Sequence, residues 1–195
     1  MPFLSEKAKS TVSAGAGGGY LNPSKIQSGT SVRFSLLSDS PLEFWEVWGE
    51  AVDNSRKPFR FESQPTPEDV EAAMGANYFR RKGQDGETPE PAKFALAVPV
   101  FNHDAGLVQV LSIVQKSIAR ELDAISQLEE YSDLLSIDFQ LNKEGNGLNT
   151  EYGLRPLPRK KGSQESIDEA WSEAKKEGFD ITRLMTGGNP FKEDV

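Results

Sequence analysis

The sequence contains no cysteine and a single histidine. Without cysteine the chain forms no disulfide bond, has no thiol nucleophile and offers no cysteine ligand to zinc. The histidine, His103, falls in a predicted hairpin turn, where we expect a solvated side chain without a catalytic role. A phosphate-binding loop, a nucleophile elbow and metal-ligand spacing around His103 are absent too. The sequence therefore predicts a protein that is not an enzyme and uses no cofactor or metal.

Long apolar runs are also missing. No segment approaches the roughly 20 apolar residues that are needed to span a bilayer. The composition, 36% hydrophobic and 27% charged, is typical of a soluble protein. The N-terminus lacks the continuous apolar core of a secretion signal, so we expect a cytoplasmic protein without a membrane partner.

The net charge of −8 is unevenly distributed along the 195 residues. Residues 164–195 hold eight acidic and four basic side chains, a net charge of −4, which is half of the total excess. Because phosphate binding depends on where the cations lie, the overall acidity does not exclude a nucleic-acid partner for the rest of the chain.

The region 93–158 has the pattern of a small closed barrel. Apolar runs at 93–102 and 107–114 flank turn residues and predict a hairpin. Apolar residues then recur at steps of three and four over 115–130, which predicts an amphipathic helix that caps the bottom of the barrel.

The remaining strands are predicted from two-residue alternation. Residues 134–141 alternate between apolar and polar, and the turn 144–147 is rich in glycine, so 148–155 should return antiparallel. Upstream, 31–37 alternates in the same way and predicts a first strand.

Composition divides the chain into three regions. Residues 1–19, rich in serine, alanine and glycine, predict a flexible N-terminal arm. The barrel domain should span 20–158, with 62–91 as an inserted loop. A basic linker, an acidic helix and a free tail then occupy 159–195, which we expect to form an appendage.

Aromatic and cationic residues are mixed within 44–61 and 78–82. Binding of single strands without sequence readout requires exposed rings for base stacking and cations along the phosphates. Further cations lie on polar faces or at predicted strand ends. The candidates for DNA contact are Arg33, Phe44, Trp45, Trp48, Lys57, Phe59, Arg60, Phe61, Tyr78, Phe79, Arg80, Arg81, Lys93, Lys143, Tyr152 and Arg155.

Some of these residues suit a core position equally well. Trp45 and Trp48 are three apart, so a regular strand directs them to opposite faces, and either Trp45 or the pair of Phe44 and Trp48 faces outward. Tyr152 suits an inward-facing position as well as a stacking one. For each isolated cation an ordinary solvated charge is the competing interpretation.

With these residues identified, the chain resembles a family of bacteriophage single-stranded DNA-binding replication proteins, functional analogues of the T4-type helix-destabilising protein. The resemblance covers about residues 17–158. It rests on Gly18-Gly19-Tyr20-Leu21, Gly29, Val32-Arg33-Phe34, Trp45-x-x-Trp48, Arg56-Lys57-Pro58-Phe59-Arg60, Lys93-Phe94, Ile113-Val114-Gln115-Lys116-Ser117-Ile118, Asp138, and Gly145-x-Gly147-Leu148-x-Thr150-Glu151-Tyr152 with Pro156 and Pro158.

The resemblance implies a mainly β fold: a five-stranded OB-fold barrel with one helix between strands 3 and 4, plus a C-terminal acidic helix and tail. It also implies sequence-independent binding of single-stranded DNA in phage replication, recombination or repair, in the cytoplasm of the infected host cell. The zinc site of the T4-type protein has no counterpart here because cysteine is absent, and the short acidic tail ends in Val195.

An acidic C-terminal segment is expected to recruit a phage DNA polymerase, helicase or primase. A homo-oligomer is compatible with the sequence. Two other functions remain open from the residues alone: an OB-type module for protein interaction or structure, and an RNA-binding OB barrel.

Overall fold

The computed structural model describes residues 19–192. The strands are β1 (Tyr20–Leu21), β2 (Thr30–Leu36), β3 (Leu42–Ala51), β4 (Arg56–Phe61), β5 (Tyr78–Arg80), β6 (Lys93–Asn102), β7 (Leu107–Ile113), β8 (Ile137–Glu144) and β9 (Glu151–Pro158). The α-helices are α2 (Pro67–Met74), α3 (Lys116–Ser126) and α4 (Gln164–Lys176). Short 3-10 turns are η1 (Pro23–Lys25), η2 (Glu129–Tyr131), η3 (Leu134–Ser136), η4 (Gly147–Asn149) and η5 (Ile181–Thr186).

A single nine-stranded sheet organises the described residues, and its main path is β1-β7-β6-β2-β8-β9. The predicted hairpin is confirmed as β6 and β7, and the alternating segment at 31–37 is confirmed as β2. The strand predicted at 148–155 does return antiparallel as β9, but it begins three residues later because Gly147–Asn149 form η4. The strand predicted to begin at residue 134 begins later, because Leu134–Ser136 form η3 before β8.

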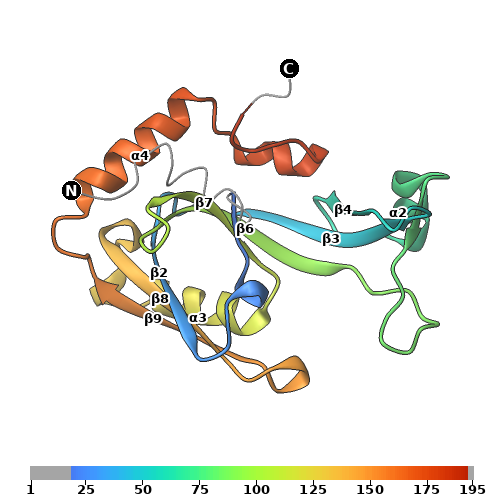
Figure 1. Ribbon diagram of the computed structural model, residues 1–195, viewed down its shortest axis with the longest axis horizontal. Coiled ribbons are helices and arrows are strands. Elements are labelled where there is room, and N and C mark those ends of the chain that lie inside the picture. The colour runs from blue at the N-terminus through green and yellow to red at the C-terminus, as the bar shows by residue number, and fades with distance from the viewer. Residues whose placement is uncertain (1–18, 193–195) are drawn as a thin grey trace.

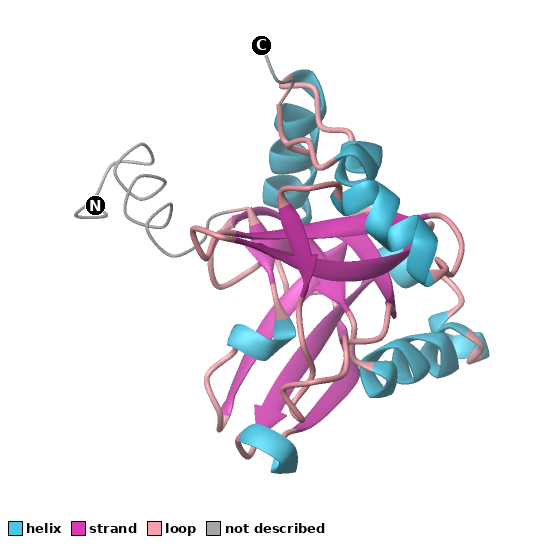
Figure 2. Ribbon diagram, turned by 90° about the vertical axis from the view of Figure 1, so that its right-hand side faces the viewer, coloured by secondary structure: helices cyan, strands magenta, loops and turns pink. Residues whose placement is uncertain are grey.

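The expectation of a closed barrel is not met. Within residues 19–192 no ladder joins β7 to β9, so the sheet curves but stays open. Helix α3 lies at this opening and contacts both β9 and β7. Figure 2 shows the strands curving around one another, with the helices outside them. The mainly β class is confirmed.

The main hydrophobic core lies between the curved sheet and α3. Alternate residues of each strand point into it, among them Phe34, Val100, Leu111 and Phe139. The rings of Phe34 and Phe139 stack with their centroids 5.6 Å apart. Helix α3 contributes Ile118 and Ile125 from its apolar stripe. Its role as the cap of this core is therefore as predicted.

Strands β3, β4 and β5 form a ribbon that extends from the rest of the sheet. Figure 1 shows β3, β4 and α2 on the right, away from β2, β8, β9 and α3. The inserted segment 62–91 contains β5 and also α2, the short helix that the Thr66-Pro67 start signal predicts at 68–74. Helix α2 begins after Thr66, whose side chain forms a capping box with Asp69.

The C-terminal segment packs on the sheet, which corrects the expectation of an appendage with a free tail. Leu184 of η5 is buried in a second core with Phe44, Ala95 and Val110, and Phe179, Ile181, Met185 and Phe191 pack around it. The Phe191 ring also meets the Tyr20 ring edge-on at 6.4 Å. In the predicted N-terminal arm, residues 1–18 lie outside the described residues.

No helix among the described residues is long and apolar enough to cross a membrane.

Candidate nucleic-acid interface

The two faces of β3 have different surroundings. Successive side chains of a strand point to opposite faces, and directly paired residues of neighbouring strands share a face. Phe44, Glu46, Trp48 and Glu50 therefore lie on one face, and Trp45, Val47 and Gly49 on the other. The sequence prediction that Trp45 and Trp48 point in opposite directions is confirmed by this regular strand.

Three cross-strand rows build the face that carries Trp48, which we call the open face. Glu46 pairs with Arg60 of β4 on one side and with Lys93 of β6 on the other. Trp48 pairs with Pro58. The backbone N–H of Arg81 donates to the Trp48 carbonyl at 3.1 Å, which brings Arg81 next to it. Glu50 pairs with Arg56 and Phe79.

Two rings and several cations of the open face are accessible. Phe79 is 60% exposed and Trp48 is 37% exposed. Two ion pairs of this face are long: Arg56 lies 3.5 Å from Glu50, and Arg81 lies 3.9 Å from Glu90. All four of these side chains remain partly or largely exposed, and pairs of this kind contribute little to stability. The two guanidinium groups can therefore exchange their carboxylates for phosphates at low cost.

The opposite face of the ribbon, the covered face, is packed under α2. Val47 is buried with Val70 and Met74, and Phe59, Phe61 and Tyr78 are half-buried around them. The Phe59 and Tyr78 rings meet edge-on at 5.4 Å. These three rings, expected from the sequence to stack on bases, are core side chains here because α2 occupies their face.

Trp45 and Arg80 also belong to the covered face. The Trp45 ring is half-buried and packs edge-on against Phe94 at 5.7 Å. Arg80 Nη2 donates to the Glu90 carbonyl at 2.8 Å, which ties β5 to the loop before β6. Lys57 is exposed at the edge of the ribbon, and its ammonium lies 5.4 Å from the centre of the Phe59 ring.

Phe44 lies on the same face as Trp48 but is only 1% exposed. It lies near the start of β3 and packs in the second core with Leu184 of η5, whereas Trp48 is not part of that core. The expectation that Phe44 stacks on a base is therefore corrected by its burial beneath Leu184. Among Phe44, Trp45 and Trp48, the accessible ring on the open face is Trp48.

Three further predicted contacts lie on β8 and β9, away from the ribbon. Arg155 donates to the Gln140 side chain, and Lys143 Nζ donates to the Ser24 carbonyl at 2.7 Å. Tyr152 packs against the main core, and burial raises the pKa of its hydroxyl. The structure does not bring these three residues together with the open face.

Arg33 belongs to a buried polar cluster around Asp138. The Asp138 carboxylate, which is 0% exposed, accepts from Arg33 Nε at 2.8 Å and from Arg159 Nη1 at 2.9 Å. The Ser35 hydroxyl donates to it at 2.7 Å, and the backbone N–H of Lys160 donates at 2.9 Å. One carboxylate thus joins β2, β8 and the segment that leads into α4. The Arg33 guanidinium is therefore engaged by Asp138 and by the Pro158 carbonyl, which argues against the predicted phosphate contact.

His103 completes this cluster, so the expectation of a solvated turn residue is wrong. Its side chain is 3% exposed, with Nε2 lying 2.8 Å from Ser35 Oγ and 3.3 Å from Asp138 Oδ2. Burial lowers the pKa of His103 and outweighs the attraction of the Asp138 charge. Burial alone would raise the pKa of Asp138, but hydrogen bonds from Ser35, Lys160 and Arg33 lower it overall.

Serine, histidine and aspartate meet in this cluster without forming a nucleophilic triad. In such a triad the two imidazole nitrogens bridge different partners. Here the same nitrogen, Nε2, faces both Ser35 and Asp138, and Ser35 is completely buried. The arrangement can stabilise the fold but cannot present a nucleophile to a substrate.

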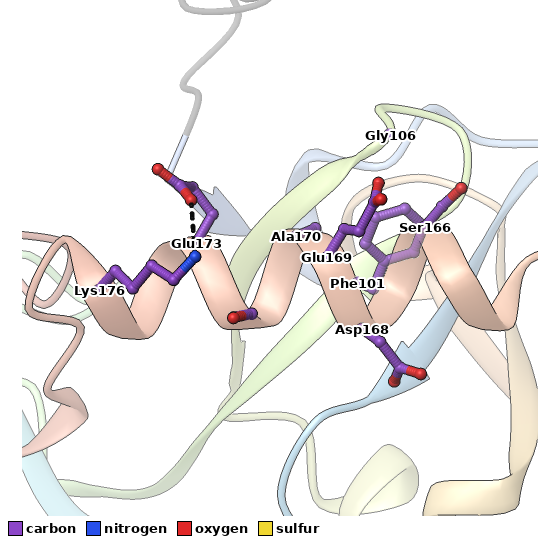
Figure 3. Close-up of a pocket in the computed structure, with 9 residues that line it drawn as sticks. Phe101, Gly106, Ser166, Asp168, Glu169, Ala170, Glu173 and Lys176 are labelled. Carbon is purple, nitrogen blue, oxygen red and sulfur yellow. Dashed lines mark ion pairs between the residues drawn. The ribbon is translucent and has the colours of Figure 1, made fainter.

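A shallow groove beside α4 is acidic. Phe101 and Gly106 of the β6–β7 hairpin line one side, and α4 contributes three carboxylates, Asp168, Glu169 and Glu173 (Figure 3). One lysine, Lys176, lies 3.8 Å from Glu173. This charge repels a phosphate backbone, so the groove is not a second nucleic-acid surface.

Two features of the open face were absent from the sequence-based candidates. Arg56 stands in the aromatic and cationic run, but only its pairing with Glu50 places it beside Phe79. Glu46 was missed because the candidates were chosen as rings and cations, and Glu46 is a carboxylate. Its position two residues before Trp48 nevertheless places both side chains on one face of the strand. No family model, no curated protein and no solved structure matches this chain significantly.

Proposed function

We propose that this chain binds single-stranded DNA without reading its sequence and that the open face of the β3–β4–β5 ribbon is the contact surface. One observation carries the proposal. Two accessible rings, Trp48 and Phe79, lie among three exposed cations, Arg56, Arg81 and Lys93, over three adjacent rows of one sheet face. Stacking of a base contributes about 1–3 kcal/mol, and cations along the groove neutralise the backbone.

An open OB-type barrel is part of this proposal. In chain order the strands β2, β6 and β7 precede α3, and β8 and β9 follow it. In space these five strands form one sheet in the order β7-β6-β2-β8-β9. In chain order the helix α3 lies between the third strand, β7, and the fourth strand, β8, which agrees with a partly open OB-fold. The ribbon is inserted between the first and second of these strands, at a loop that OB-folds use to bind oligonucleotides.

The proposed role is that of a binding protein without catalysis in phage DNA replication, where it protects and straightens the template. The acidic C-terminal segment is proposed to recruit a polymerase, helicase or primase. Support for that part comes from α4, whose carboxylates Glu165, Asp168, Glu169 and Glu173 are exposed to solvent.

The test is a titration of intrinsic tryptophan fluorescence with oligothymidine at 50 and 300 mM salt. The chain has three tryptophans, so Trp45→Phe and Trp171→Phe leave Trp48 as the only reporter. Stacking should quench Trp48, and phosphate contacts should weaken binding steeply at the higher salt concentration.

Absence of quenching together with absence of salt-sensitive binding would refute the proposal and favour a protein-interaction module. Oligouridine and duplex DNA provide the comparison of ligands. Tighter binding of oligouridine than of oligothymidine would instead support an RNA-binding barrel. Equal binding of duplex and single strands would argue against base stacking, because paired bases do not expose their faces.

A further inference from the structure

The Trp48 indole is connected to the C-terminal segment by three consecutive hydrogen bonds. Trp48 Nε1 donates to Glu46 Oε1 at 3.0 Å. The other oxygen of the same carboxylate, Oε2, accepts from Arg60 Nε at 3.0 Å. Arg60 Nη1 in turn donates to the carbonyl of Leu184 in η5 at 2.9 Å.

The middle of this series of hydrogen bonds is shielded from water, whereas the Trp48 ring at its end is 37% exposed. The side chains of Arg60 and Glu46 are 13% and 9% exposed. The Arg60 guanidinium also lies 5.2 Å from the centre of the buried Phe44 ring. A charge pair in such surroundings keeps its geometry, because little water reaches either group to form hydrogen bonds in place of its partner. Arg60 is therefore fixed by η5 and Phe44, and Glu46 is fixed by Arg60.

We infer that Glu46 is a positioning residue for the Trp48 ring, and that the C-terminal segment sets the orientation of this ring through Arg60. The inference rests on the proposed function of the open face. A ring that is oriented before the ligand arrives loses less conformational entropy on binding. On this view the packed C-terminal segment supports the binding face, and Glu46 favours DNA binding although its charge repels phosphate.

Two glutamates of the open face make a matched pair for the test. Glu46 and Glu50 flank Trp48 at equal spacing on one strand face, and each pairs with an arginine of β4. Glu46 bonds to the indole, whereas Glu50 pairs with Arg56. Glu46→Gln and Glu50→Gln each remove one negative charge. If charge alone mattered, both variants would bind oligothymidine more tightly at 50 mM salt.

The inference predicts opposite signs for the two variants. Glu50→Gln should tighten binding. Glu46→Gln should weaken it about five- to tenfold, as expected for the loss of one ordinary hydrogen bond, because the amide nitrogen of Gln cannot replace the second accepting oxygen of Glu46. Tighter binding of Glu46→Gln would overturn the inference. Glu46→Asp keeps the charge but is too short for both contacts, so it should weaken binding as well, and wild-type affinity would count against the inference.

A second measurement needs no DNA and separates this inference from the proposed function. In the full chain with Trp48 as the only tryptophan, Glu46→Gln and Arg60→Lys should lower the fluorescence anisotropy and increase acrylamide quenching of Trp48, whereas Glu50→Gln should not. Thermal unfolding followed by circular dichroism checks that each variant is folded. Unchanged Trp48 mobility in Glu46→Gln would refute the positioning role, and unchanged mobility in Arg60→Lys would refute the link to η5. Wild-type protein that fails to bind oligothymidine would refute the proposed function instead.

Discussion

Arginines meet carboxylates in two regions of this molecule, and the two regions differ in burial and in distance. Around Asp138, Arg33 and Arg159 lie within 2.9 Å of a carboxylate that has no exposed surface. On the open face, Arg56 and Arg81 lie 3.5 and 3.9 Å from Glu50 and Glu90, with most of these side chains in contact with solvent.

The difference shows that residue type alone does not identify a phosphate-binding arginine. A buried pair that loses one partner leaves an uncompensated charge, so its arginines are committed to the fold. An exposed, long pair costs little to break, so its arginines are available to a ligand. We therefore expect the Asp138 cluster to control stability and the open face to control DNA binding.

The largest expected effect is on stability. Asp138→Ala removes the buried carboxylate that two partly buried guanidinium groups and the buried His103 share, and should lower the free energy of unfolding by about 3–5 kcal/mol. Glu50→Gln, the matched change on the open face, should alter it by less than about 0.5 kcal/mol. Denaturant unfolding measures both, and equal losses would remove the distinction between the two regions.

The next effect is on binding. Trp48→Ala and Phe79→Ala should each weaken binding of oligothymidine by about 1–3 kcal/mol, because each removes a stacking surface. Phe79 is 60% exposed, so its removal should move the unfolding transition little, whereas Trp48→Ala should move it further because Trp48 is 37% exposed and donates to Glu46. Trp45→Phe, on the covered face, serves as the control and should bind like wild type. Weaker binding by Trp45→Phe than by Trp48→Ala would instead place the contact surface on the covered face of the ribbon.

A smaller effect concerns the salt dependence of binding. Arg56→Gln and Arg81→Gln should each reduce the slope of log affinity against log salt by about 1, since each removes one phosphate contact. Arg155→Gln, on the barrel, should leave the slope unchanged. If Arg155→Gln reduced the slope and the two ribbon variants did not, the phosphate path would follow β8 and β9 instead.

The smallest effect is a dependence of stability on pH. Burial lowers the pKa of His103 below its ordinary value of 6.5, and hydrogen bonds lower that of Asp138 below 3.8. The unfolded chain therefore binds more protons than the folded chain as the pH falls, so acid favours unfolding. Stability should begin to fall near pH 6.5 through His103 and fall further below pH 3.8 through Asp138. Oligothymidine affinity of the folded protein should not follow the His103 titration.

His103→Gln is the matched variant for this measurement. Thermal unfolding between pH 7.5 and 5 should show a flatter profile for His103→Gln than for wild type, because the titrating group has been removed. An equally steep profile in the variant would assign the dependence to other groups.

Much of the fold follows from local periodicity. Alternation in 31–37, the apolar runs around 103–106 and the helical spacing of 115–130 led to β2, the β6–β7 hairpin and α3. These predictions succeeded because each pattern is complete within a few residues of its own element. The predicted free tail failed because the partners of Phe191, which are Tyr20 and Phe179, are distant or weakly patterned in the sequence.

The candidate site was predictable only in outline. Alternation showed that Trp45 and Trp48 point in opposite directions, but it contains no information on which face α2 covers. Arg33 and Arg81 are both candidate phosphate contacts in the sequence, and only their partners in the structure separate them. His103 opens the turn 103–106 in the sequence, yet its ring lies against Ser35 of β2 and Asp138 of β8.

Three features could be predicted from the amino-acid sequence: the mainly β class, the order of the principal strands and α3, and the concentration of rings and cations near β3. All three are properties of composition and short-range spacing. The tertiary structure alone decided which side of β3 is open, which arginines are committed to buried carboxylates and that η5 packs on the sheet. These outcomes depend on pairings between residues far apart in the sequence, such as Arg60 with Leu184 and Tyr20 with Phe191. A register between distant strands is set by long-range packing, which no local pattern contains.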